Sequence, residues 1–121
     1  MTDTKIDFAK MDGLVPGIVQ DARSGQVLMV GFLNDASYQK TLETGFVTFW
    51  SRTRQKLWMK GETSGNRLRV VEASTDCDND TLLFRVEVEG DGLVCHEGTV
   101  SCFTRPIAVP VASTTTSAEV R

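Results

Sequence analysis

The alternation of apolar and polar residues predicts a chain built mainly of short β-strands. Residues 82–89 give the clearest case, because Leu82, Phe84, Val86 and Val88 stand at every second position along eight residues. Other short apolar segments predict further strands at 17–20, 26–30, 46–50, 57–59, 68–72 and 93–95. Residues 21–25 separate the first two of these strands and end in a glycine, which indicates a hairpin loop.

One helix is expected between the second and third of these strands. Asn34 or Asp35 can cap its N-terminus, and Gly45 can end it, because glycine readily adopts the left-handed conformation. Tyr38 and Leu42 lie four residues apart, so we expect both on the face that packs inward. One helix among about seven strands predicts a mainly β or α+β fold, in a small single domain with a mixed sheet.

Length and charge narrow the class of protein. The chain has 121 residues and a net charge of −3, which suits one domain and disfavours a nucleic-acid partner. Residues 1–110 are expected to form that domain, and the small, polar residues 111–121 a flexible tail. The longest apolar runs fall well short of the ~18 residues that a membrane span needs, and the first ten residues are charged. We therefore expect a cytoplasmic protein with no membrane partner.

Three carboxylates at alternate positions form the first candidate site. If the segment is extended, Asp76, Asp78 and Asp80 point to one face and Cys77 points to the other. Carboxylates held this close repel each other unless a cation such as Mg²⁺ or Ca²⁺ lies among them. A solvated acidic loop is the alternative. An EF-hand is excluded, because Thr81 stands where that loop requires glycine.

The cysteines and the single histidine form the second candidate site. An odd number of cysteines argues against a disulfide framework, whereas buried free thiols are an ordinary alternative. Cys77, Cys95 and Cys102 can supply three thiolates to Zn²⁺, which leaves one position open as in catalytic zinc sites. His96 is either a fourth ligand or a general acid/base. In an extended segment it would point away from the side that Cys95 faces, which favours the second role.

A third group of residues is typical of phosphate binding. Basic, hydroxyl and glycine residues gather in two predicted loops, although solvated turns would explain them equally well. The spacing does not match a Walker A motif. The candidate substrate-binding residues are Trp50, Ser51, Arg52, Arg54, Lys60, Glu62, Ser64 and Asn66.

Three segments together closely resemble the phosphoribosyl-AMP cyclohydrolase family of histidine biosynthesis. They are FWSRTRQKLWMKGETSGN (49–66), DCDNDTLLFRVEVEG (76–90) and CHEGTVSCF (95–103), within a similarity that spans about residues 10–105. The resemblance implies hydrolytic opening of the adenine ring of 1-(5-phosphoribosyl)-AMP at the N1–C6 bond, the third step of the pathway. A monofunctional hydrolase is expected, because the chain is too short for the pyrophosphohydrolase domain that some relatives carry.

The resemblance also implies cofactors, roles and an assembly. It assigns zinc to the three cysteines and magnesium to the three aspartates, which leaves His96 free for the proton transfer expected above. It implies an intertwined homodimer with one zinc per subunit, each held by Cys77 of one chain and by Cys95 and Cys102 of the other. Glu97 departs from the threonine usual in the family, and its carboxylate would raise the basicity of His96 if the two touch.

Two other functions remain open at this point. A non-enzymatic zinc- or calcium-binding module would have a closed metal site with four protein ligands and no affinity for nucleotides. A zinc deaminase acting on another nucleotide would carry the H-x-E…P-C-x-x-C signature, which this sequence lacks.

Overall fold

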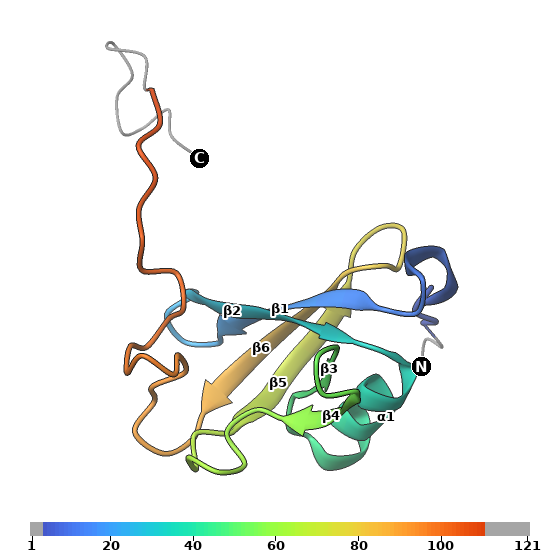
Figure 1. Ribbon diagram of the computed structural model, residues 1–121, viewed down its shortest axis with the longest axis horizontal. Helices are drawn as coiled ribbons and strands as arrows, with labels where there is room; N and C mark the ends of the chain where they lie inside the picture. The colour runs from blue at the N-terminus through green and yellow to red at the C-terminus, as the bar shows by residue number, and fades with distance from the viewer. Residues whose placement is uncertain (1–3, 111–121) are drawn as a thin grey trace.

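The computed structural model describes residues 4–110, so the tail expected at 111–121 lies outside the described residues. These residues contain six strands, one α-helix and one short 3-10 helix (Figure 1), which confirms the expected mainly β or α+β class. In chain order the elements are η1 (Ala9–Met11), β1 (Val15–Asp21), β2 (Val27–Leu33), α1 (Asp35–Thr44), β3 (Thr48–Ser51), β4 (Lys56–Met59), β5 (Leu68–Thr75) and β6 (Leu82–Val88).

Four strands form a mixed sheet in the order β2-β1-β6-β5, and β3 and β4 form a separate antiparallel hairpin. Within the larger sheet β1 and β6 run parallel, whereas the other neighbours are antiparallel. Figure 1 shows α1, β3 and β4 on the same side of this sheet. The 21–25 hairpin between β1 and β2 is confirmed. No helix within residues 4–110 is long and apolar enough to cross a membrane.

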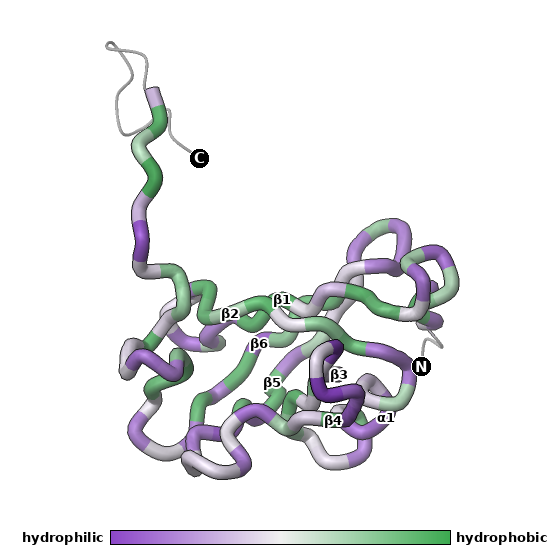
Figure 2. The backbone as a smooth tube through the Cα atoms, viewed as in Figure 1, coloured by the Kyte–Doolittle hydropathy of each residue, from purple (hydrophilic) through white to green (hydrophobic). Residues whose placement is uncertain are grey.

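The core lies between the four-stranded sheet and the elements on that side. Leu82, Phe84 and Val86 of β6 are all buried, so the alternation predicted for this strand is confirmed. Figure 2 shows the hydrophobic stretches concentrated in the strands, while the connecting loops are mostly hydrophilic. Gly31 of β2 is required by this packing, because a Cβ atom there would lie 2.5 Å from the Phe49 ring. Phe49 consequently packs directly against the sheet backbone.

The helix begins and ends as predicted. Asn34 is its N-cap and forms a capping box with Ser37, while Gly45 ends it with φ of 81°. The prediction that Leu42 faces inward is wrong, however, because Leu42 is 55% exposed. The buried positions of α1 are Ser37 and Thr41. Tyr38 does pack against the core as predicted, so the helix packs through this ring and through two hydroxyl groups.

The strand predicted at 93–95 is also absent: these residues form no regular element. The side chain of Asn66, and not a neighbouring strand, holds this segment in place. The Asn66 amide donates to the Leu93 carbonyl at 2.9 Å and to the Asp91 carboxylate at 2.7 Å. This local bonding satisfies the backbone without a strand partner.

Candidate active site

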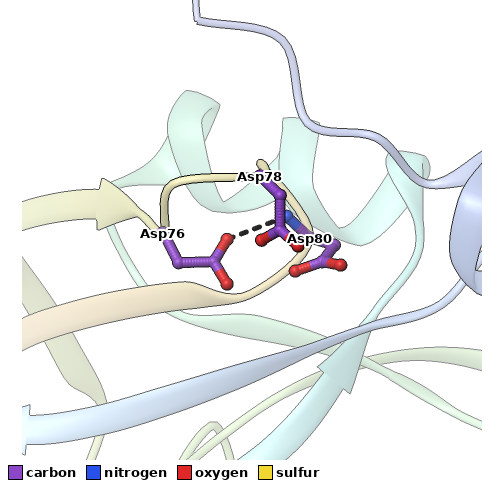
Figure 3. Close-up of side chains that lie close together, drawn as sticks. All are labelled: Asp76, Asp78 and Asp80. Atoms are coloured by element: carbon purple, nitrogen blue, oxygen red, sulfur yellow. Dashed lines mark hydrogen bonds between the residues drawn. The ribbon is translucent and has the colours of Figure 1, made fainter.

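The three aspartates lie in the tight turn that joins β5 to β6 (Figure 3). The Asp76 carboxylate accepts hydrogen bonds from the backbone N–H groups of Asp80 at 3.0 Å and Thr81 at 3.2 Å. Asn79 adopts the left-handed conformation with φ of 63°. The extended conformation expected here is therefore wrong, since an aspartate that bonds to nearby backbone N–H groups favours a turn. The turn instead brings one oxygen of each aspartate within 4.8 Å of the others.

A lysine from the N-terminal part of the chain reaches this aspartate cluster. The Lys10 ammonium lies 3.4 Å from the Asp80 carboxylate and 3.8 Å from that of Asp78. It also donates to the Asp78 backbone carbonyl at 2.8 Å. Sequence reasoning missed this residue, because Lys10 and Asp78 lie 68 positions apart. The contact demonstrates that the cluster accommodates a cation, and its oxygen donors are those that Mg²⁺ prefers.

The aspartates differ in their affinity for protons. The backbone N–H of Asp80 lowers the pKa of Asp76, because this hydrogen bond favours the charged carboxylate. Contacts with the carboxylates of Asp80 and Asp76 raise the pKa of Asp78. Two neighbouring negative charges therefore disfavour ionisation of the middle aspartate. A divalent cation bound among the three would relieve that repulsion.

Cys95 and Cys102 come together at the opposite end of β6. Cys102 is held beside the start of β2, because its backbone N–H donates to the Leu28 carbonyl at 2.8 Å. Cys95 begins a tight turn in which the backbone N–H of Glu97 lowers the pKa of the Cys95 thiol. Burial, followed by the contact with Cys95, raises the pKa of Cys102. The two sulfurs are thus neighbours, and one of them is favoured as the thiolate that metals bind.

Cys77 is not part of this pair. It is exposed in the turn before β6, whereas Cys95 and Cys102 follow the far end of that strand. A seven-residue strand is about 20 Å long at ~3.3 Å per residue. Within residues 4–110, the aspartate cluster is the only group of three or more His, Cys, Asp or Glu side chains close enough to share a metal. One chain therefore does not bring its three cysteines together.

A cavity of about 520 Å³ opens beside Cys95 and His96. Its volume lies in the range of small-molecule sites. Five of the predicted substrate-binding residues line it, namely Arg54, Lys60, Glu62, Ser64 and Asn66. Lys56 and Trp58 are among the further lining residues. Sequence reasoning missed both, because Trp58 read only as a strand position and Lys56 only as the residue before that strand. Three cationic side chains and an indole ring make the cavity suitable for an anion that carries an aromatic ring.

The other three predicted substrate-binding residues do not line this cavity. The Arg52 guanidinium lies 4.4 Å from the centre of the Phe32 ring, in a cation–π contact. The Ser51 hydroxyl accepts the backbone N–H of Arg54 at 3.2 Å. Trp50 belongs to β3 and pairs with Leu57 of β4. These residues shape the turn that carries Arg54.

His96 is exposed at the rim of the cavity, in the turn that follows Cys95. This turn is not extended, so the reasoning that placed His96 and Cys95 on opposite sides of an extended segment does not apply. The Glu97 carboxylate forms an ion pair with Arg105 at 3.2 Å. His96 itself lies beside Cys95 and lines the cationic cavity, so a molecule bound in the cavity is within its reach.

Comparisons with known proteins point to one family. The family model described as phosphoribosyl-AMP cyclohydrolase matches residues 29–104. A phosphoribosyl-AMP cyclohydrolase of Solibacter usitatus is 62% identical over 100 residues, which cover 83% of this chain and 79% of that protein. One from Desulfatibacillum aliphaticivorans is 56% identical over 99 residues, which cover 82% of this chain and 78% of the relative.

Longer relatives match as well. The histidine biosynthesis bifunctional protein HisIE of Bacteroides thetaiotaomicron is 53% identical over 107 residues, which cover 88% of this chain and 52% of that protein. The match of the family model extends from β2 through Cys102 and so includes the aspartate cluster, the thiol pair and the cavity. The chain belongs to the phosphoribosyl-AMP cyclohydrolase family and is a hydrolase of histidine biosynthesis.

Proposed function

We propose that this enzyme adds water to C6 of the adenine ring of 1-(5-phosphoribosyl)-AMP and breaks the N1–C6 bond. The observation that carries the proposal is the cavity in which Cys95 and His96 lie beside Arg54, Lys56 and Lys60. A reactive thiol pair and a histidine at one end of a cationic cavity suit a substrate with two phosphate groups and a ring to be attacked.

The thiol pair fits a zinc ion when a third thiolate joins it. Cys95 and Cys102 are already neighbours, and hydrogen bonding to the backbone favours the thiolate form of Cys95. Cys77 lies at the far end of β6, so in this proposal the third thiolate comes from the Cys77 of a second copy of the chain. Zinc held by three thiolates supplies an activated water molecule at neutral pH.

The aspartate cluster fits Mg²⁺, because it offers three carboxylates with oxygens within 4.8 Å of one another. Asp76 is held in place by two backbone N–H groups, so the cluster is organised before an ion arrives. Its position next to Cys77 would place it beside the cavity of the second copy. There it would help to bind the anionic substrate.

The chain's own residues have separate tasks in this reaction. N1-alkylation of adenine makes C6 electrophilic, and His96 takes the proton released when water adds to that carbon. His96 then delivers a proton to N1 as the N1–C6 bond breaks. Arg54, Lys56 and Lys60 bind the phosphate groups. The half-buried indole ring of Trp58 offers a surface on which the purine stacks.

An assay of the purified protein tests this proposal. The protein is supplied with Zn²⁺ and Mg²⁺ and given 1-(5-phosphoribosyl)-AMP, and the absorbance of the ring-opened product is followed. We expect turnover that is lost after chelation and restored by Zn²⁺ together with Mg²⁺. AMP is the control substrate, because it lacks the N1 substituent that activates C6. Failure to turn over the N1-substituted nucleotide with both metals present would refute the proposal.

A further inference from the structure

The cavity beside Cys95 is bounded by two segments from different parts of the chain. One is the loop after β4, which contributes Lys60, and the other follows β6 and carries Cys95. Asn66 lies where the two segments meet, shortly before β5, and also lines the cavity. Only 8% of this residue is exposed. A polar side chain that is buried to this extent requires hydrogen-bond partners, and these partners indicate its role.

The carboxamide of Asn66 bonds to the segment after β6 through both of its polar atoms. Its Nδ2 donates to the Asp91 carboxylate at 2.7 Å and to the Leu93 carbonyl at 2.9 Å. Its Oδ1 accepts the backbone N–H of Asp91 at 3.1 Å. The Asp91 carboxylate accepts in turn the backbone N–H of Leu93 at 3.2 Å. Because the protein uses both amide protons, Asn66 has no donor left for a substrate.

Other contacts do little to fix the backbone of this segment. Within residues 4–110, no backbone–backbone hydrogen bond joins residues 91–94 to another part of the chain. The Val94 side chain is buried in the core, but an apolar contact of this kind is not directional. The hydrogen bonds of Asn66 therefore determine where the backbone that leads to Cys95 lies.

Both segments pass so close to Asn66 that a side chain is excluded at the point of contact. A Cβ atom on Gly61 would collide with the Asn66 backbone carbonyl, and one on Gly90 would collide with Asn66 Oδ1. Both glycines also have a positive φ, of 83° and 72°. Asn66 is thus packed tightly between the loop that carries Lys60 and the segment that leads to Cys95.

We propose that Asn66 is a positioning residue for the reaction, because its carboxamide fixes Cys95 relative to the loop that carries Lys60. The inference rests on the proposed function, in which Cys95 binds zinc and Lys60 binds a phosphate group. It goes further, because the sequence predicts that Asn66 contacts the substrate, whereas its hydrogen bonds support the metal-binding thiol.

The two thiols differ in their need for such a support. Cys102 is bonded directly to the sheet, through its backbone N–H and the Leu28 carbonyl of β2. The backbone N–H of Cys95 bonds only within its own turn, to the Thr99 carbonyl at 3.0 Å. Loss of the Asn66 bonds would let Cys95 move relative to the bound nucleotide. A reaction that depends on orientation then becomes slower.

Asn66→Asp tests this role with almost no change in shape. Aspartate still accepts the Asp91 N–H, but it donates nothing to Leu93 and places a second carboxylate against that of Asp91. We expect kcat to fall ~10–100-fold, while KM for the nucleotide stays within about twofold. In cobalt-substituted protein the cobalt–thiolate absorption should shift, and a chelator should remove the metal ~10-fold faster.

A second substitution should partly restore the function of this variant. Asn66→Asp combined with Asp91→Asn forms the carboxamide–carboxylate hydrogen bond again, with donor and acceptor exchanged. We expect kcat to recover at least about fivefold over Asn66→Asp, with the cobalt absorption moved back towards that of the wild type. The bond to the Leu93 carbonyl is not restored, so kcat should stay below the wild-type value.

Asn34→Asp is the matched control, because Asn34 caps α1 through a side-chain oxygen that aspartate also has. It should leave kcat, the cobalt absorption and the rate of chelation unchanged. If Asn66→Asp does not fold, Asp91→Ala replaces it, since Asp91 is exposed and its loss removes one partner of Asn66. This variant should lower kcat about threefold or more and shift the cobalt absorption in the same direction.

Two patterns of results would overturn the positioning role. A KM raised about tenfold with unchanged cobalt absorption would make Asn66 a substrate contact. Unchanged kcat and absorption in Asn66→Asp, or a double variant no better than the single one, would also reject the proposal. Turnover by the wild type is measured separately. If the wild type is active and Asn66→Asp is unaffected, only the positioning role fails. If the wild type is inactive, the proposed reaction fails, and the cobalt absorption still tests Asn66.

Discussion

The Lys10 ammonium lies 3.4 Å from the Asp80 carboxylate, at the edge of the aspartate cluster. The two residues come from distant parts of the chain: Lys10 belongs to η1, near the N-terminus, and Asp80 precedes β6, the last strand. Burial would lower the pKa of Lys10, but the charges of Asp80, Asp78 and Asp7 together raise it. The lysine therefore stays charged and neutralises part of the cluster. It occupies a position that competes with a metal ion.

Replacing Lys10 should change metal affinity in a defined direction. We expect Lys10→Met to bind Mg²⁺ or Mn²⁺ two- to fivefold more tightly, because no ammonium has to be displaced from the carboxylates. Isothermal titration of the zinc-loaded protein measures this. Lys40→Met is the control, since Lys40 pairs with Glu43 on α1, away from the cluster. Weaker binding by Lys10→Met would mean that Lys10 organises the cluster and does not compete with the ion.

A buried hydroxyl joins the helix to the β3 strand. The Thr41 hydroxyl donates to the Ser37 carbonyl at 2.9 Å and accepts the backbone N–H of Thr48 at 2.9 Å. Thr41→Val keeps the shape of the side chain but leaves that N–H unpaired in the core. We expect it to lower the free energy of unfolding by about 1–3 kcal/mol.

Urea unfolding followed by circular dichroism measures the effect of Thr41→Val. Thr44→Val is the matched control, because the Thr44 hydroxyl also bonds to backbone groups but is exposed to water. Water replaces the hydrogen bonds lost there, so the control should cost less than about 0.5 kcal/mol. Equal losses in the two variants would contradict the importance of burial at Thr41.

Apolar periodicity predicted those parts of the fold in which backbone pairing and burial act together. It placed β6 within one residue and identified the hairpin between β1 and β2. It failed where a polar side chain bonds to nearby backbone: Thr41 replaces Leu42 on the inner face of the helix, and Asp76 folds an expected strand into a turn. Such hydrogen bonds cannot be predicted from the pattern of hydrophobic residues, because that pattern carries no information about which polar groups meet.

For the candidate site too, part of the result could be predicted from the sequence and part could not. The residue types indicated the chemistry of both candidate metal sites, since carboxylates and thiolates prefer different ions. Their positions in space could not be predicted, because Cys77 and the thiol pair are close in sequence but separated by the length of β6. Lys10 was missed for the opposite reason: it is distant in sequence from the aspartates that it approaches.

The role of His96 can be separated from that of the thiols. We expect His96→Ala to retain zinc and to lose activity by ~10²–10⁴-fold, because its proposed task is proton transfer and not metal binding. Zinc content by atomic emission and turnover under saturating substrate are measured on the same sample. Cys102→Ser is the comparison, since it should lose zinc and activity together. A His96→Ala protein isolated without zinc would make His96 a ligand.

Mixing two inactive variants tests whether zinc is shared between protomers. Cys77→Ser and Cys95→Ser should each lose zinc and turnover, because each removes one thiolate from every site of its own homodimer. In a mixed dimer the two substitutions are distributed unequally between the two zinc sites. One site then carries both defects, and the other combines the intact Cys77 of one protomer with the intact Cys95 of its partner.

We therefore expect activity to return towards half of the wild-type value per mixed dimer, together with one bound zinc. Subunit exchange is verified by native mass spectrometry, because recovery requires that mixed dimers form. Mixing Cys95→Ser with Cys102→Ser is the control: both defects lie in the thiol pair, so each site of the mixed dimer still lacks one thiolate. If all three thiolates came from one chain, both mixtures would stay inactive despite exchange. Recovery in the first mixture alone therefore distinguishes a shared zinc from one held within a single chain.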